Sequence, residues 1–337
     1  MNKLEHNNYN QLVATIGSLL QAGKQKAFQK VNTILVETYW NIGKQIIEFE
    51  QAGEERAEYG SELLKNMSKD LKANFGKGFS RSNLQNMRLL YQKFPIFQSV
   101  SGKLSWSHYA ELLSVSDELA FSFYHKQTEI ENWSVRELKR QIQSSLFERL
   151  ALSKDKKQVL DLSEKGQLIQ TTKDIIKDPY VFEFLQLEQK DQWLEKDLED
   201  ALVNKLGQFL LELGKGFAFI GKQYKITLDN NHFFVDLVFY HRILKCFVLI
   251  DLKKGKVSHQ DIGQMNMYLN YFTSEENTDS DNPPIGIVLG ADKNDILVEY
   301  ATAGITNQLF VSKYELYLPN KEVLKEEMHK LLKAKKD

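Results

Sequence analysis

Two aspartates and a lysine lie on two strand-like segments, HFFVDLVFYH and KCFVLIDLK, that are separated by a very short connection. If these segments form a hairpin centred between Ile243 and Leu244, Asp236 stands directly opposite Asp251. Lys253 follows Asp251 by two positions, which places both side chains on one face of the strand. The hairpin would therefore gather two carboxylates and one ammonium in a small part of a largely apolar sheet.

Two opposed carboxylates need a counterion. Directly opposed strand residues have Cβ atoms roughly 4.5–5.5 Å apart, and like charges in such a pair are destabilising. A buried carboxylate without a partner loses several kcal/mol of solvation, whereas a hard divalent cation prefers oxygen ligands and neutralises both groups. The alternative is a structural Asp–Lys pair at a strand end, with Asp236 exposed. We favour the metal interpretation because both carboxylates are in register with Lys253.

The segments around this hairpin show the pattern of an α/β layer. We expect strands at residues 217–228, 232–241, 245–253, 284–290 and 308–316. Helices are predicted at Ile262–Tyr271 and Asp295–Ala303, and a longer helix at Gln192–Leu213 that ends at Gly214. The middle strands are apolar on both faces, which predicts a mixed sheet covered by helices on both sides.

The N-terminal part of the chain is predicted to be all-α. Its apolar residues recur at helical spacing, and no proline precedes Pro95, which permits long helices. Ser134 and Glu137 form a capping box, which predicts a helix from Val135 to about Leu150.

These elements predict three parts of the chain. A helical domain over residues 1–152 would bind DNA or mediate oligomerisation. Residues 153–190 would form a linker with an apolar docking segment at Tyr180–Leu187, and residues 191–337 would form the α/β domain. A chain of 337 residues is long enough for two domains that each bury a core.

Composition excludes several classes of protein. The single cysteine, Cys246, rules out a disulfide framework, and the amino terminus has no signal peptide pattern. No apolar run approaches the ~20 residues of a membrane span, so we expect a cytoplasmic protein with no membrane partner. Scattered histidines argue against zinc. The net charge of −1 means that any nucleic-acid surface must come from local clusters of Lys and Arg.

The spacing of the hairpin residues resembles the signature of PD-(D/E)XK nucleases, a hairpin that carries Asp and then (Asp/Glu)-x-Lys. Val235 replaces the usual Pro, and Asp251 replaces the commoner Glu. The wider sequence resembles the YhcG family of bacterial proteins over nearly its whole length. The resemblance is carried by LEKDLEDALVNKLGQFLLELGKGFAFIGKQYKI, FFVDLVFYH, IDLKKGK and GQMNMYLNYF, and in the first half by NIGKQI, FGKGFSRSNLQNMRLLYQKFP, LSWSHYAELL and WSVRELKRQI.

This resemblance implies a restriction-endonuclease-like fold and roles for the hairpin residues. Asp236 and Asp251 would bind Mg²⁺ (or Mn²⁺), and Lys253 would orient or activate the attacking water and stabilise charge on the phosphate.

The resemblance also implies an acidic residue on the preceding helix that completes the metal site. Glu199 is the best candidate, and Glu195 lies one helical turn earlier on the same face. Gln264 matches a position where the superfamily often holds a polar active-site residue, and Gln223 is a weaker candidate.

A basic helix face near Ser80 is a candidate for nucleic-acid binding. Lys77, Arg81, Gln85 and Arg88 are of the types that contact phosphates and base edges, so the helix could be a recognition helix. The alternative is the solvated face of an ordinary amphipathic helix.

We therefore expect a metal-dependent endonuclease that hydrolyses phosphodiester bonds in DNA and that forms a dimer or a higher oligomer. A DNA-binding or assembly protein of the same fold with weak or absent turnover is the first alternative. An RNase that uses the same site is the second.

Overall fold

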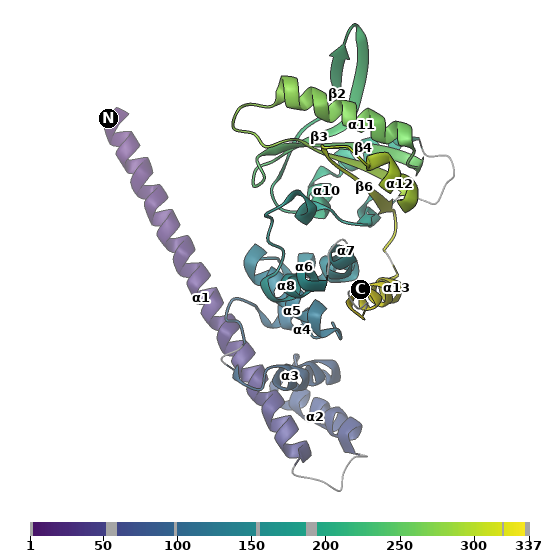
Figure 1. Cartoon of the computed structure of the whole chain (residues 1–337). Helices are drawn as coiled ribbons and strands as arrows, with labels where there is room; N and C mark the ends of the chain where they lie inside the picture. Colours follow the sequence, from purple (N-terminus) through teal and green to yellow (C-terminus); the bar gives the residue numbers. More distant parts are fainter. Residues whose placement is uncertain are drawn as a thin grey trace. The chain divides into compact units, whose positions relative to one another are not determined.

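The computed structural model describes residues 3–51, 59–97, 100–152, 156–186, 194–318 and 320–333. The chain divides into two compact units, Met1–Lys139 and Arg140–Asp337 (Figure 1). The second unit therefore begins N-terminal to the boundary that we expected after residue 152. In the ranges given above, no helix is both long enough and apolar enough to cross a bilayer.

The first unit is helical, as predicted. It contains α1 (Lys3–Gln51), α2 (Tyr59–Phe75), α3 (Arg81–Lys93), α4 (Trp106–Leu112), α5 (Glu118–Glu131) and the start of α6 (Val135–Gln143). The helices α2 and α3 lie beside the C-terminal half of α1 (Figure 1). Their shared core contains Ile46 of α1, Leu64 of α2, and Leu84 and Met87 of α3.

A close crossing fixes α3 against α1. A Cβ atom at Gly43 would lie 2.0 Å from the carbonyl oxygen of Met87, so any other residue at this position would push the two helices apart. Beside the crossing, the indole Nε1 of Trp40 donates a hydrogen bond of 2.7 Å to the carbonyl oxygen of Phe94. The second half of α1 is thus the element on which the unit is built.

The second unit contains a six-stranded mixed sheet with strand order β1-β6-β5-β4-β3-β2. The strands are β1 (Tyr180–Val181), β2 (Phe217–Leu228), β3 (Asn231–His241), β4 (Cys246–Lys256), β5 (Ile285–Asp292) and β6 (Gln308–Glu315). The pairs β2–β3 and β3–β4 are antiparallel, and the other neighbouring pairs are parallel. The five longer strands were predicted from the sequence.

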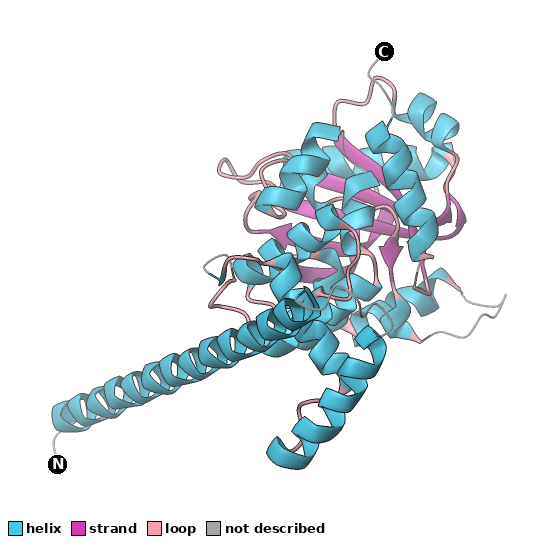
Figure 2. Cartoon of the chain, turned by 90° about the horizontal axis from the view of Figure 1, so that it is seen from below, coloured by secondary structure: helices cyan, strands magenta, loops and turns pink. Residues whose placement is uncertain are grey.

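Helices cover both faces of this sheet, as the doubly apolar strands predicted (Figures 1 and 2). The helices α9 (Glu195–Asn204) and α10 (Leu206–Leu213) pack on one face, and α11 (His259–Tyr271) and α12 (Asp295–Thr302) pack on the other. A Cβ atom at Gly286 of β5 would lie 2.7 Å from Cγ of Met265, so a glycine lets α11 approach the sheet closely.

The predicted register of the central hairpin is confirmed. The β3–β4 ladder runs from the pair Leu237–Ile250 to the pair His241–Cys246, and a turn of residues 242–245 closes it. Asp236 and Asp251 are the next positions in this register. Sequence periodicity and the short connection were therefore sufficient to align the two strands.

Two predicted helices are interrupted in the structure. The helix expected at Gln192–Leu213 is broken at Lys205 into α9 and α10, and residues 192 and 193 lie outside the described residues. The helix expected from Val135 to about Leu150 begins where predicted but breaks before α7 (Leu146–Leu152), where Ser145 has a φ of 52°. In both cases the apolar periodicity continues across the break, so the sequence pattern does not reveal it.

The segment expected to be a linker contains structured elements. These are α8 (Lys156–Lys165), two short 3₁₀ helices, η2 (Thr172–Ile175) and η3 (Glu183–Leu185), and the edge strand β1. Tyr180, at the start of the expected docking segment, is fully buried, whereas Leu187 lies outside the described residues. The remaining elements of the unit are the π-helical turn η4 (Phe272–Glu276) and α13 (Lys321–Lys333), and α13 packs against α7.

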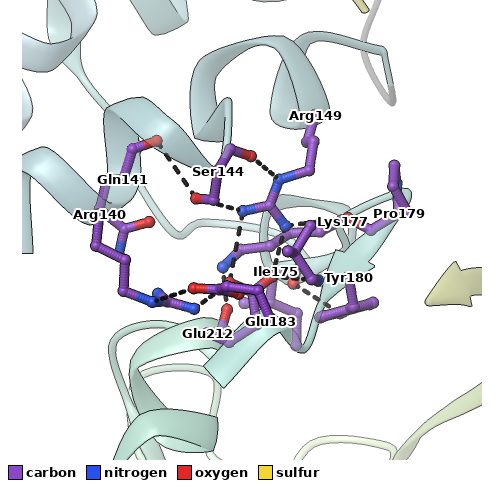
Figure 3. A network of polar contacts seen from close by, with 11 residues as sticks. Arg140, Gln141, Ser144, Arg149, Ile175, Lys177, Pro179, Tyr180, Glu183 and Glu212 are labelled. Carbon is purple, nitrogen blue, oxygen red and sulfur yellow. Dashed lines mark hydrogen bonds and ion pairs between the residues drawn. The ribbon is translucent and has the colours of Figure 1, made fainter. Parts of the chain in front are cut away.

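A buried polar network joins α6, α7, the segment before β1, and α10 (Figure 3). The guanidinium of Arg149 and the carboxylate of Glu212 are both 0% exposed and form an ion pair. Arg149 also donates to the carbonyl oxygens of Ser144 and Pro179, at 2.8 and 3.0 Å. Glu212 accepts a hydrogen bond of 3.0 Å from the backbone N–H of Val181 in β1.

Two more cations lie close to Glu212. Arg140 lies 3.2 Å from Oε2 of Glu212 and 3.0 Å from Oε1 of Glu183, and the ammonium of Lys177 donates to the carbonyl oxygen of Glu212. Burial alone would raise the pKa of Glu212, but Arg149, Lys177 and Arg140 together lower it to about 2. Burial lowers the pKa of Lys177 to about 7. The charge on Glu212 is therefore required by its surroundings.

We expect Glu212→Gln to lower the free energy of unfolding by about 3–5 kcal/mol, because it leaves the buried Arg149 guanidinium without its counterion. Chemical denaturation of the full chain, followed by circular dichroism, measures this change. Asp161→Asn is the control, since Asp161 and Lys165 form an exposed ion pair on α8. Equal denaturation midpoints for the two variants would contradict the assigned role of Glu212.

Glu212 should also make the second unit sensitive to acid. Its pKa is about 2 in the folded chain, against an ordinary value of 4.5, so the unfolded chain takes up this proton first as the pH falls. The stabilisation is fully present above pH 4.5 and is lost between pH 4.5 and pH 2. Unfolding free energies measured across this window should fall steeply for the wild type and less steeply for Glu212→Gln.

Candidate active site

The central hairpin brings together the three residues that the sequence singled out. The ammonium of Lys253 lies 2.8 Å from Oδ2 of Asp251, so the two side chains share one face of β4 as predicted. Oδ2 of Asp236 accepts a hydrogen bond of 2.7 Å from the backbone N–H of Leu252, which holds this carboxylate beside Asp251. Asp251 is 3% exposed, so the cluster is set into the protein and not displayed on its surface.

Gln223 connects the hairpin to α9. Its Nε2 donates to Oε2 of Glu199 at 2.7 Å and to Oδ1 of Asp236 at 3.0 Å. The β2–β3 ladder pairs Lys222 with Leu237, so Gln223 stands across from Asp236. The structure therefore connects Glu199 to the hairpin through Gln223, the weaker of the predicted polar candidates.

Lys253 has two further acidic neighbours. Its Nζ lies 3.9 Å from Oε2 of Glu195 and 3.9 Å from Oδ1 of Asp261, on α9 and α11 respectively. Glu195 also accepts a hydrogen bond of 3.0 Å from the backbone N–H of Lys254. Asp261 was not among the predicted site residues, although the Ser258 capping box that it completes is a recognisable pattern in the sequence.

Gln264 is linked to the hairpin through Tyr268. Its Nε2 donates to the hydroxyl of Tyr268, and that hydroxyl donates a hydrogen bond of 3.0 Å to the carbonyl oxygen of Phe234. The structure thus connects Gln264 to the β3 backbone two residues before Asp236.

Burial dominates the electrostatics of the carboxylates. Burial and the neighbouring Asp236 raise the pKa of Asp251 to about 7. Burial also raises the pKa of Asp236, although the Leu252 N–H and Lys253 act against it, and it raises the pKa of Glu199. These three groups resist ionisation unless positive charge is brought to them.

The surroundings of Lys253, in contrast, favour its charged form. Burial alone would lower its pKa, but the carboxylates of Asp251, Glu195 and Asp236 together raise it. Lys253 is therefore a stable cation at neutral pH.

The carboxylates of this cluster are candidate ligands for a divalent cation. Among the described residues, no group of three His, Cys, Asp or Glu side chains is arranged as a metal site. The chemistry of the pair Asp236 and Asp251 nevertheless fits, because both are oxygen donors and burial raises the pKa of each carboxyl group. Glu199 joins this pair only through the amide of Gln223.

The predicted nucleic-acid face on α3 is divided. Lys77, just before the helix, and Arg81, in its first turn, are exposed. Arg88 forms an ion pair of 2.8 Å with Glu50 of α1 and also contacts the side-chain oxygen of Gln85. The structure thus uses Arg88 and Gln85 in contacts within the first unit and leaves Lys77 and Arg81 on its surface.

Two family descriptions match the chain in consecutive segments. The DUF1016 N-terminal domain matches residues 15–149, and the YhcG PDDEXK nuclease domain matches residues 173–331. The second match contains all of the hairpin residues and α9. The chain is also 41% identical, over 95% of its own length and 93% of the relative's, to the Escherichia coli (strain K12) protein called "Putative nuclease YhcG".

Two solved structures resemble part of the fold. One is a repair endonuclease from Pyrococcus abyssi, with 15% identity, 39% of this chain covered and a TM-score of 0.28. The other is described as "Structure of EndoMS-dsDNA2 complex", with 14% identity, 40% of this chain covered and a TM-score of 0.27. The similarity spans 50% of the length of each of these two chains.

We expect Asp251→Asn to stabilise the metal-free protein at pH 8, by on the order of 2 kcal/mol, because it removes a buried charge opposed to Asp236. Thermal unfolding in EDTA measures the change. Asp281→Asn is a control of opposite sign, since hydrogen bonds from Thr278 and Tyr240 lower the pKa of Asp281 and so stabilise its charged form. A fall in melting temperature for Asp251→Asn would show that Lys253 satisfies its charge without a metal ion.

Proposed function

The chain belongs to the YhcG family, whose C-terminal domain is a PD-(D/E)XK nuclease domain, and we propose that it is a metal-dependent endonuclease that hydrolyses phosphodiester bonds in DNA. The observation that carries this proposal is the cluster of Asp236, Asp251 and Lys253 on the central hairpin. A domain that served only as a scaffold would have no need of two carboxyl groups with raised pKa values beside a lysine.

Asp236 and Asp251 would hold the divalent cation, Mg²⁺ or Mn²⁺, and Glu199 would complete the set. The bound cation supplies Lewis-acid stabilisation of charge on the phosphate and lowers the pKa of water. Because Asp251 is buried, a cation bound to it would lie in a part of the protein where electrostatic interactions are strong.

Lys253 would stabilise the negative charge that grows on the phosphate oxygens as the phosphodiester is attacked. Its raised pKa supports this role, because a lysine that stays protonated offers positive charge and three hydrogen-bond donors. The same property argues against Lys253 as the base that removes a proton from water. Glu195 and Asp261, each 3.9 Å from its Nζ, would hold the ammonium in place.

Gln223, Gln264 and Tyr268 would be positioning residues. Gln223 fixes the distance between α9 and β3 through its two hydrogen bonds, so it would set where Glu199 stands relative to Asp236. Gln264 and Tyr268 brace the β3 backbone at Phe234, close to Asp236.

DNA is the proposed substrate, and the first unit would contribute to binding it. Lys77 and Arg81 are exposed at the start of α3, where they could contact phosphates. Arg88 and Gln85 are less suited to reading bases, because their side chains already contact Glu50 and each other.

Cleavage of supercoiled plasmid by the full chain tests the proposal. We expect nicking or linearisation with Mg²⁺ or Mn²⁺ and none with EDTA. Lys253→Met should lower the rate about 100-fold or more, because it removes the charge beside the reacting phosphate. Asp251→Asn should do the same, although we expect this variant to be more stable than the wild type.

The matched control is Lys256→Ala, an exposed lysine at the end of the same strand, which should cleave at the wild-type rate. Cleavage that survives both Lys253→Met and Asp251→Asn would place the active site elsewhere. A wild type that binds DNA in gel shifts but never cuts it would favour a binding or assembly protein, and cleavage of RNA alone would favour an RNase.

A further inference from the structure

The helix α1 carries an exposed apolar stripe between Tyr9 and Ile34. Most of its members are spaced by three or four residues, and the one longer step, from Leu20 to Val31, is about three helical turns, so all of them lie on one face of the helix. They are Tyr9, Leu12, Ile16, Leu20, Val31 and Ile34, whose exposed fractions lie between 46% and 63%. An exposed apolar face on a helix of 49 residues is typical of a protein–protein interaction site.

This stripe is not the face of α1 that packs within the first unit. The buried residues of α1 include Val36, Trp40 and Ile47, and they face α3 and its neighbours together with Gly43. Val36 is two positions from Ile34, which is about 200° around an α-helix. The apolar stripe therefore lies on nearly the opposite side from the core of the unit.

The same side of α1 continues into an apolar groove. Beyond Ile34 the three-or-four spacing reaches Thr38, Ile42, Gln45 and Phe49, and these residues line a cavity of about 960 Å³ between α1 and α2. The other wall of the groove includes Leu63, Met67 and Leu71 of α2, and Phe75 at its end is 70% exposed. The groove is thus wide, mostly apolar and open to solvent.

The stripe cannot reach this groove within one chain. Both lie on one continuous helix, and Leu12 and Gln45 are about 50 Å apart at 1.5 Å per residue. If the α1 helix of a second copy packs antiparallel to the first, the apolar stripe of each copy can be buried in the groove of the other. Such an arrangement is isologous and closes on itself.

The charges along α1 support the antiparallel direction. From Asn7 to Val36 the helix has Lys24, Lys26 and Lys30 and no acid, whereas from Glu37 to Gln51 it has three acids and one lysine. Lys26, Lys30, Glu37 and Glu48 recur at helical repeats along one edge of the stripe. An antiparallel pair brings this edge against the same edge of the partner, so its basic part faces an acidic part.

We propose that the chain forms an antiparallel homodimer through this side of α1, with the apolar stripe of each copy seated in the α1–α2 groove of the other. The assembly does not depend on nuclease activity, so the two proposals can fail separately.

Light scattering on the full chain, without metal or nucleic acid, tests the dimer. The wild type should have the mass of two chains. Leu12→Glu/Ile16→Glu should raise the dissociation constant about 100-fold or more and give the mass of one chain, because two charges enter an apolar contact. Both side chains are exposed, so the unit should still fold.

Ser18→Glu is the matched control, since Ser18 is an exposed residue of the same helical segment, two positions from both Ile16 and Leu20. It should remain dimeric. A wild type with the mass of one chain, or a Leu12→Glu/Ile16→Glu variant that stays dimeric, would overturn the proposal.

A charge exchange tests the direction of the pair. Lys26→Glu/Lys30→Glu and Glu37→Lys/Glu48→Lys should each weaken the dimer when alone, because like charges then face each other. Mixed in equal amounts, the two variants should recover dimerisation. A mixture that stays as weak as its components would rule out the antiparallel contact.

Discussion

A fully buried ion pair between Arg149 and Glu212 ties the helices before the sheet to the sheet itself. Two charged groups out of reach of water are stable only together, so α7, β1 and α10 are held in one arrangement. The DUF1016 match ends at residue 149 and the nuclease match begins at residue 173, yet this contact joins residues from both. The sequence families and the compact units of the chain therefore divide at different places.

The same constraint extends to the candidate active site through α10 and α9. Glu212 fixes α10, and α9, which precedes it across the break at Lys205, carries Glu195 and Glu199 to the hairpin. Both of these acids act on residues of the sheet, one beside Lys253 and the other through Gln223. A rigid α10 thus gives the acidic residues of α9 a fixed base, which matters for a site whose carboxylates resist ionisation.

Local sequence patterns predicted the part of the site that depends on local geometry. The two-residue period of strands and a short connection were enough to place Asp236, Asp251 and Lys253. The sequence did not predict that Gln223 faces Asp236, because a bulge between Phe219 and Gly221 shifts the β2–β3 register by one residue. Without that bulge Lys222 would face Asp236. A single sequence gives no pattern that predicts the extra residue of such a bulge. Asp261 and the Arg149–Glu212 pair likewise depend on contacts between distant segments.

Because α13 packs on α7, the second unit cannot finish folding during synthesis until α13 has been translated. Leu324 and Met328 of α13 are buried, so α7 and its neighbours lack part of their cover until the ribosome has released residues 321–333. The helical first unit has no such requirement, since its core is assembled from residues that are translated early. We expect the N-terminal unit to fold while the ribosome is still translating the sheet. The nuclease unit would then close only after residues 321–333 have been translated, so its candidate active site would form after the N-terminal unit has folded.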